Sequence, residues 1–435
     1  MSALAIRGGY VVGVDSVELA DVLIVDGRIA QVGTIDAPPG VEEIDASDCW
    51  VGPGFVDLHT HLREPGLEAA ETIESGARAA AVGGYSAVLA MPNTEPALDN
   101  VALVEHVLAQ GSRALVDVAV AGAITQGRRG EKLAPLAEMA RLGVRLFTDD
   151  GAAVASAQVM RRALAYARPL GVRLAQHCEE PTLANAGSMN EGPLAGRLGL
   201  IGRPALAEEL LVARDLELVR DTGACLHFLH LSTARSVELV WAARRQGLDV
   251  TCEVAPHHLS LDESACEGYD PLYKVNPPLR GAGDVAGLRE ALRRGEIDAV
   301  ATDHAPHLPE SKDLVFDEAP AGMLGLEHAA SLTLEALGED ADPRRFFSLL
   351  SRRPAAIAQL RAGDAPVRHT AHGGAMTPGE DANVVVFDPA LRWVGDRDSL
   401  QSRARNTPYH GRELRGRARA TIVAGRLVAR EGSVL

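Results

Sequence analysis

Eight apolar segments, each followed by a polar or amphipathic stretch, constrain the fold of this chain more than any other feature. The segments are residues 55–61, 85–92, 114–124, 144–150, 172–177, 225–231, 249–257 and 297–304. Helical patterns such as those of residues 67–84 and 205–221 lie between them. This alternation is typical of strand–helix units, and eight units predict an α/β chain with a (β/α)8 TIM barrel. The active site of such a barrel lies at the carboxyl ends of its strands.

The two ends of the chain follow a different pattern. Residues 3–51 contain short apolar or alternating runs separated by turn pairs, and residues 383–388, 420–423 and 426–429 repeat it. Such runs are typical of β-hairpins, and neither end alone offers enough strands to bury a face. We therefore expect a small β-sandwich domain built from residues 1–52 and 373–435, with the barrel occupying residues 53–372.

Composition and charge exclude several classes of protein. The 435 residues carry 43 Lys and Arg against 59 Asp and Glu, and this net charge of −16 disfavours nucleic acid as a partner. The five cysteines form no CxxC pair, which argues against a disulfide framework or a cysteine-ligated metal. The N-terminus has no signal-peptide pattern, and no apolar run approaches the roughly 18 residues of a membrane span. A cytoplasmic protein with a small-molecule substrate is expected.

Histidine and aspartate residues gather where the apolar segments end. His59 and His61 are two residues apart on one expected strand, so both imidazoles point to the same face. His177, His230 and Asp303 end three further segments. A polar group in so apolar a setting needs a partner, and four imidazoles with a carboxylate at one barrel mouth suit zinc.

The chain resembles the dihydroorotase family of the cyclic amidohydrolase superfamily in the segments DLHTHLREPG, AMPNTEP, FTDDG, QHCEE, HLST, EVAPHH, NPPLR and ATDHAPH. The resemblance runs from about residue 4 to the C-terminus and implies the same barrel with a split β-sandwich. It also implies a zinc hydrolase that interconverts N-carbamoyl-L-aspartate and L-dihydroorotate in de novo pyrimidine (UMP) biosynthesis. The metal ligands that it implies are His59, His61, His177, His230 and Asp303. Asp303 is also the implied catalytic proton shuttle.

The ligand that would bridge two zinc ions differs from the carboxylated lysine usual in the superfamily. Most two-metal members of the superfamily use a carboxylated lysine, but the three lysines here, Lys132, Lys274 and Lys312, stand elsewhere. The fourth expected strand ends in Asp149 and Asp150 instead, which resembles the bacterial class I subclass that uses aspartate. We assign Asp150 as the bridge between two Zn²⁺ ions and keep Asp149 as the alternative. If both acids only cap the following turn, a second ion has no bridge.

The expected substrate is small and acidic. Arg63 follows the histidine pair by two residues, so its guanidinium can bind a carboxylate through two parallel hydrogen bonds near the metal. Asn276 precedes Pro277, which favours an extended backbone there. The family motifs imply a substrate-binding set of His61, Arg63, Asn93, Asn276, His307, Ala321 and Gly322. Ala321 departs from the large apolar residue usual in the family, whereas a backbone contact at Gly322 needs no side chain.

Two alternatives differ in substrate or in class. A hydantoinase or allantoinase-type cyclic ureide hydrolase would share the histidine pair and Asp303, but it is expected to have the bridging lysine and needs no Arg63. A non-catalytic scaffold for aspartate carbamoyltransferase would have lost metal ligands, whereas the set here is complete. The resemblance also implies a homo-oligomer and allows an active enzyme to form a complex with aspartate carbamoyltransferase.

Overall fold

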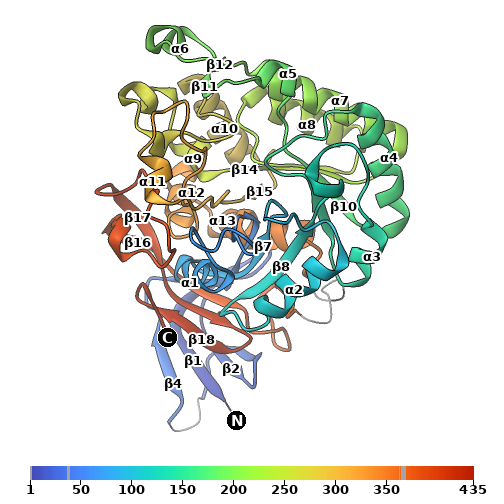
Figure 1. Cartoon of the computed structure of the whole chain (residues 1–435). Helices are drawn as coiled ribbons and strands as arrows, with labels where there is room; N and C mark the ends of the chain where they lie inside the picture. The colour runs from blue at the N-terminus through green and yellow to red at the C-terminus, as the bar shows by residue number, and fades with distance from the viewer. Residues whose placement is uncertain (1, 37–39, 362, 364–368) are drawn as a thin grey trace.

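The computed structural model describes residues 2–36, 40–361, 363 and 369–435, and its larger body is a barrel of eight parallel strands (Figure 1). Each apolar segment contains one of these strands, so the barrel prediction is confirmed. The strands pair in the order β15-β14-β13-β10-β9-β8-β7-β6. They are β6 (Phe55–Thr60), β7 (Tyr85–Ala90), β8 (Asp117–Gly122), β9 (Leu146–Thr148), β10 (Arg173–Gln176), β13 (Leu226–Phe228), β14 (Val250–Val254) and β15 (Ala299–Val300).

The first and last barrel strands meet at their carboxyl ends. Thr60 forms a parallel bridge with His304, and the His61 N–H donates to the His304 carbonyl over 2.9 Å. This contact brings the residues after β15 beside the histidine pair of β6. The closure of the barrel therefore lies at the edge where the polar residues gather.

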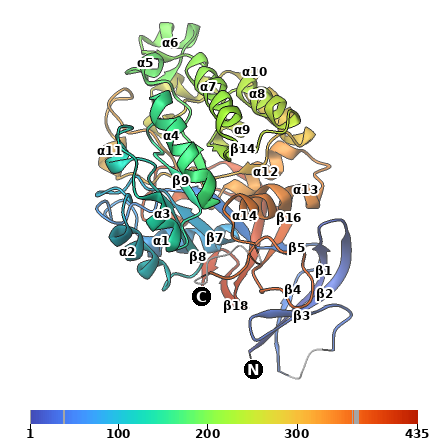
Figure 2. The same ribbon diagram turned by 90° about the vertical axis from the view of Figure 1, so that its right-hand side faces the viewer.

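Helices surround the barrel strands on the outside (Figures 1 and 2). The α-helices are α1 (Ile73–Gly83), α2 (Val101–Gly111), α3 (Leu136–Arg141), α4 (Ala157–Ala167), α5 (Pro181–Ala184), α6 (Pro193–Leu198), α7 (Leu206–Thr222), α8 (Ala234–Arg245), α9 (Pro256–Ser260), α10 (Ala282–Arg294), α11 (Pro309–Lys312), α12 (Ala329–Leu337), α13 (Pro343–Phe347) and α14 (Arg353–Ile357). Helix α7 lies within one residue of its expected range of 205–221, but α1 begins six residues later than the pattern from residue 67 suggests. Thr72 caps α1, because its hydroxyl accepts the Ser75 N–H and Ser75 reciprocates.

Strands from both ends of the chain form a second, mixed sheet of nine strands. They are β1 (Ala3–Val12), β2 (Val17–Val25), β3 (Arg28–Gly33), β4 (Glu42–Asp45), β5 (Trp50–Pro53), β16 (Val384–Val394), β17 (Glu413–Val423), β18 (Arg426–Arg430) and β19 (Ser433–Val434). The two ends join where β5 pairs with β16, with Val51 opposite Val386. Ile6, Val51, Val386 and Ile422 are buried in one apolar core, so the prediction of one β-unit from both ends is confirmed. The exact domain boundaries stay a prediction.

Two short strands, β11 (Met189–Asn190) and β12 (Gly202–Arg203), pair apart from both sheets. All five cysteines lie in the described part of the chain and are free thiols, four of them buried. Among the described residues, no helix combines the length and the apolar character that crossing a membrane requires.

Candidate metal centre and substrate cavity

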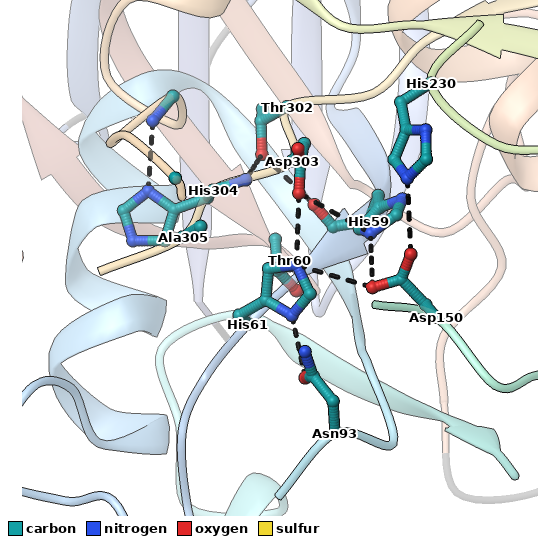
Figure 3. A network of polar contacts seen from close by, with 12 residues as sticks. His59, Thr60, His61, Asn93, Asp150, His230, Thr302, Asp303, His304 and Ala305 are labelled. Carbon is teal, nitrogen blue, oxygen red and sulfur yellow. Dashed lines mark hydrogen bonds and ion pairs between the residues drawn. The ribbon is translucent and has the colours of Figure 1, made fainter. Parts of the chain in front are cut away.

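The carboxyl ends of the barrel strands bring the predicted polar residues together (Figure 3). His59 lies in β6 and His61 directly after it. Asp150 lies two residues beyond β9, and His177 immediately follows β10. His230 lies two residues beyond β13, and Asp303 lies three residues beyond β15. These strand ends share one edge of the barrel, and this explains why residues far apart in sequence meet there.

His59, His61 and Asp150 form the first group of candidate metal ligands, with one ligand atom of each lying within 4.8 Å of the others. The Nε2 atom of His59 is 3.1 Å from Asp150 Oδ2. The Nε2 atom of His61 is 3.6 Å from the same oxygen. All three side chains are buried.

Asp150, His177 and His230 form the second group under the same distance limit. Here Asp150 uses its other oxygen, because Oδ1 lies 3.5 Å from His177 Nδ1 and 3.3 Å from His230 Nε2. One carboxylate thus faces a histidine pair with each oxygen, as a bridging ligand would. Asp149 points elsewhere and accepts the Thr125 N–H over 2.9 Å. Of the two aspartates that the sequence left open, the structure places Asp150 in the groups.

The donor atoms fit divalent metal ions. The buried Nε2 atom of His59 lies 3.1 Å from an Asp150 oxygen and 3.6 Å from an Asp303 oxygen, as a nitrogen that shares an ion with these carboxylates would. His177 Nδ1 and His230 Nε2 lie 3.0 Å apart, so one ion could accept both lone pairs. Burial would raise the pKa of Asp150, but the adjacent His59, His177 and His230 hold it well below its usual range. An ionised carboxylate among imidazole nitrogens is a donor set that suits zinc.

Two buried acids, Glu253 and Glu179, contact the second ring nitrogens of His59 and His177. The sequence did not predict this role for them. Glu253 Oε1 lies 3.0 Å from His59 Nδ1, and Glu179 Oε2 lies 3.0 Å from His177 Nε2. Arg203 Nη1 donates to the same Glu179 oxygen over 2.7 Å. Such partners fix the orientation of a ligating imidazole. Glu253 could have been identified from the sequence, because it is an acidic residue inside the apolar segment 249–257.

Asp303 lies against the first group and also lines the cavity above it. Its Oδ1 atom is 3.0 Å from His61 Nε2 and 3.6 Å from His59 Nε2. Burial would raise the pKa of Asp303, but these histidines hold it well below its usual range. Its backbone φ of 47° falls in the left-handed region that side chains rarely adopt, a strain typical of functional sites.

A cavity of about 140 Å³ opens beside the two groups. All seven predicted substrate residues line it: His61, Arg63, Asn93, Asn276, His307, Ala321 and Gly322. Gly151 and Ala305 also line it and were not predicted, although each lies within two residues of a predicted aspartate. The structure therefore places the expected substrate residues around one space next to the candidate metal ligands.

Arg63 and Asn276 offer complementary chemistry to that space. Arg63 is 9% exposed, and its Nε donates to the Pro306 carbonyl over 3.1 Å. Burial lowers the pKa of Arg63 to about 10, so the side chain stays charged at neutral pH. Within the described part of the chain, the buried Oδ1 atom of Asn276 has no hydrogen-bond partner. The cavity therefore combines a cation with an unsatisfied acceptor.

Comparison with known proteins relates the chain to one family. Residues 50–236 match the family described as "Dihydro-orotase-like". A "Dihydroorotase" of Pelotomaculum thermopropionicum is 46% identical over 433 residues, covering 98% of this chain and 99% of that protein. A "Dihydroorotase" of Mycobacterium tuberculosis is 45% identical over 423 residues, covering 96% of each. The chain belongs to the dihydroorotase family.

Solved structures show that the fold of this dihydroorotase family member extends to other enzymes. The L-hydantoinase from Arthrobacter aurescens superposes with a TM-score of 0.89 at 25% identity, covering 100% of this chain and 98% of that one. A D-hydantoinase from a Thermus species gives a TM-score of 0.82 at 27% identity, covering 99% and 96%. Sequence identity is much higher with the dihydroorotases, so the hydantoinases share the architecture at a greater distance.

Ala321 contributes only a methyl group to one cavity wall. The backbone of this wall is engaged within the protein: the Gly322 N–H donates to the Lys274 carbonyl over 2.8 Å. His307 Nε2 lies 2.8 Å from the Ala321 carbonyl. A Cβ at Gly322 would lie 2.6 Å from Ala305 Cβ, and the φ of 135° favours glycine. The wall is thus held by backbone contacts, and the expected backbone contact between Gly322 and substrate stays a prediction.

Proposed function

We propose that the chain is a dihydroorotase that interconverts N-carbamoyl-L-aspartate and L-dihydroorotate in pyrimidine biosynthesis. The observation that carries the proposal is the position of Asp150, whose two oxygens face separate histidine pairs beside the cavity. Arg63 on the cavity wall supplies the cation that an acidic substrate needs. High identity to dihydroorotases supports the same assignment.

The proposed cofactor is a pair of Zn²⁺ ions. His59, His61 and Asp303 would hold one ion and His177 and His230 the other, with Asp150 shared. Zinc at such a site lowers the pKa of coordinated water to about 7 and polarises a carbonyl oxygen. The buried acids behind His59 and His177 would keep those rings oriented toward the ions.

Asp303 is the proposed catalytic proton carrier. In ring opening, its carboxylate would take a proton from the attacking water and give it to the departing ring nitrogen. In ring closure the same proton would travel in the opposite order. The position of Asp303 on the cavity wall, with Oδ1 3.0 Å from His61 Nε2, suits a group that exchanges a proton with water and substrate.

Arg63 would bind the substrate carboxylate that does not react. Asn93 and His307 are the proposed further contacts of this carboxylate, and the unpartnered Oδ1 of Asn276 would accept a ring N–H. These contacts hold the ring in one orientation against the metal centre. Correct orientation is a major source of rate acceleration, because it removes the entropy of alignment from the chemical step.

Metal analysis combined with substrate comparison tests the proposal. Purified protein should contain two zinc ions per chain and open dihydroorotate, followed by its ultraviolet absorbance. Dihydrouracil and hydantoin, which lack the carboxylate, should react far more slowly. Preference for hydantoin by the zinc-loaded protein would instead support the hydantoinase alternative. Lack of turnover on all three, with binding to aspartate carbamoyltransferase, would support the scaffold alternative.

The cytoplasmic location, the homo-oligomer and the complex with aspartate carbamoyltransferase stay predictions. Light scattering of the purified chain, alone and mixed with aspartate carbamoyltransferase, measures both kinds of association. Cell fractionation measures the location.

A further inference from the structure

A segment between β16 and β17 leaves the terminal sheet and contacts residues that line the cavity. In Figure 1 these two strands continue from the sheet along the side of the barrel. Asn406 lies in this segment and is 3% exposed. The sequence analysis assigned it no role, and it does not belong to the candidate metal groups.

The Asn406 side chain connects two cavity walls. Its Oδ1 accepts the His307 N–H over 3.0 Å. Its Nδ2 donates to the Ala305 carbonyl over 2.9 Å and to the Gly322 carbonyl over 3.1 Å. In addition, the Asn406 carbonyl accepts the Leu324 N–H over 3.0 Å. The first wall, residues 305–307, follows Asp303, and the second wall contains Ala321 and Gly322.

The second wall is held through three consecutive carbonyl groups, each facing a different side chain. Lys312 Nζ donates to the Pro320 carbonyl over 2.7 Å, and His307 Nε2 lies 2.8 Å from the Ala321 carbonyl. Asn406 Nδ2 donates to the third carbonyl, that of Gly322. Because Ala321 brings no large side chain, the position of this backbone decides how closely the wall covers a bound ring. Asn406 ties that backbone directly to the first wall.

We propose that Asn406 is a positioning residue that sets the spacing of the two substrate walls, an inference that rests on the proposed dihydroorotase function. Its role needs a carboxamide, because one group must accept from an N–H and donate to two carbonyls at once. An aspartate of the same shape would place an acceptor against two carbonyl oxygens. The spacing of the walls would then change around a direct backbone link, the Ala305 N–H to the Met323 carbonyl over 2.9 Å, while the metal ligands, which Asn406 does not contact, would keep their places.

The test compares Asn406→Asp and Asn406→Ala with a matched control, Asn383→Asp. Asn383 is 4% exposed, and its Nδ2 donates over 2.8 Å to both Thr370 Oγ1 and the Ala371 carbonyl. It lies outside the cavity, so it measures the cost of removing a buried carboxamide alone. The measurements are zinc content, melting temperature, kcat and KM for dihydroorotate, and calorimetric binding of orotate, a planar ring with the same carboxylate.

Both Asn406 variants should keep two zinc ions and raise KM and the orotate Kd by about tenfold or more, with a smaller change in kcat. Asn383→Asp should lower the melting temperature with KM unchanged. Unchanged KM and orotate Kd in the Asn406 variants, or an equal rise in the control, would overturn the proposal. So would loss of zinc or of the folded state in both variants. Wild-type protein that binds orotate but does not open dihydroorotate would contradict the proposed function alone, since orotate binding still reports on the walls.

Discussion

Replacement of Arg63 by methionine should lower kcat/KM for an acidic substrate far more than for a neutral one. Arg63 is buried, lines the cavity and keeps its charge at neutral pH, since its pKa is about 10. Methionine preserves much of the apolar stem but removes the bidentate contact with a carboxylate. A charge-assisted contact of this kind contributes about 1.5 to 3 kcal/mol. Because 1.4 kcal/mol corresponds to a factor of ten, kcat/KM for dihydroorotate should fall by about 10- to 150-fold.

The assay measures kcat/KM for dihydroorotate and for dihydrouracil, which has no carboxylate and should be affected far less. The ratio of kcat/KM for dihydroorotate to kcat/KM for dihydrouracil should therefore fall sharply, while zinc content stays at the wild-type value. Arg78→Met is a matched control, because half-buried Arg78 donates to Gln401 Oε1 over 3.2 Å and does not line the cavity. Equal losses on both substrates, or loss of zinc, would show that Arg63 supports the structure of the site and does not bind the carboxylate.

Three further substitutions test the metal bridge, the proton carrier and the second wall. Asp150→Ala should reduce the zinc content toward one ion per chain, because it removes the carboxylate shared by both groups; two ions in the variant would contradict the bridge. Asp303→Asn keeps the shape but cannot carry the proton, so kcat should fall by about 10² to 10⁴, and a milder loss would indicate another base. Gly322→Ala should raise KM for dihydroorotate, since the new Cβ would lie 2.6 Å from Ala305 Cβ. Gly338→Ala is its control, with a φ of 100° but no atom within 4 Å of the new Cβ; a similar rise in KM there would refute the crowding argument.

The strands and their chemistry could be predicted because they depend on local patterns. A buried parallel strand needs a short continuous apolar run, so all eight strands lay inside the segments identified. The barrel then dictates that residues after those runs converge, which is why His177 and His230 could be expected to meet. The choice between Asp149 and Asp150 was not local. It depends on Thr125, whose N–H donates to the Asp149 carboxylate. Asp150 is therefore the aspartate that contacts the histidines.

Contacts between distant segments escaped the sequence analysis. Glu253 and Glu179 are ordinary acids in the sequence, and their role appears only when the strand ends place them behind His59 and His177. Asn406 is 101 residues from Ala305, and no spacing rule relates two irregular segments so far apart. Hydrophobic periodicity reports which face of an element is buried, but it carries no information about which distant side chain satisfies a given carbonyl.

Residues between the strands of the terminal sheet therefore help the barrel to position the site. The segment that carries Asn406 is also held near the metal centre by Glu71, which accepts the Ser402 hydroxyl and, over 3.1 Å, the Arg403 N–H. Glu71 in turn lies 3.4 Å from the ring of His304, the residue directly after Asp303. One segment from the far end of the chain thus supports the end of the last barrel strand on one side and the substrate wall on the other. The β-unit built from both chain ends thus supports residues that line the cavity as well as completing its own sheet.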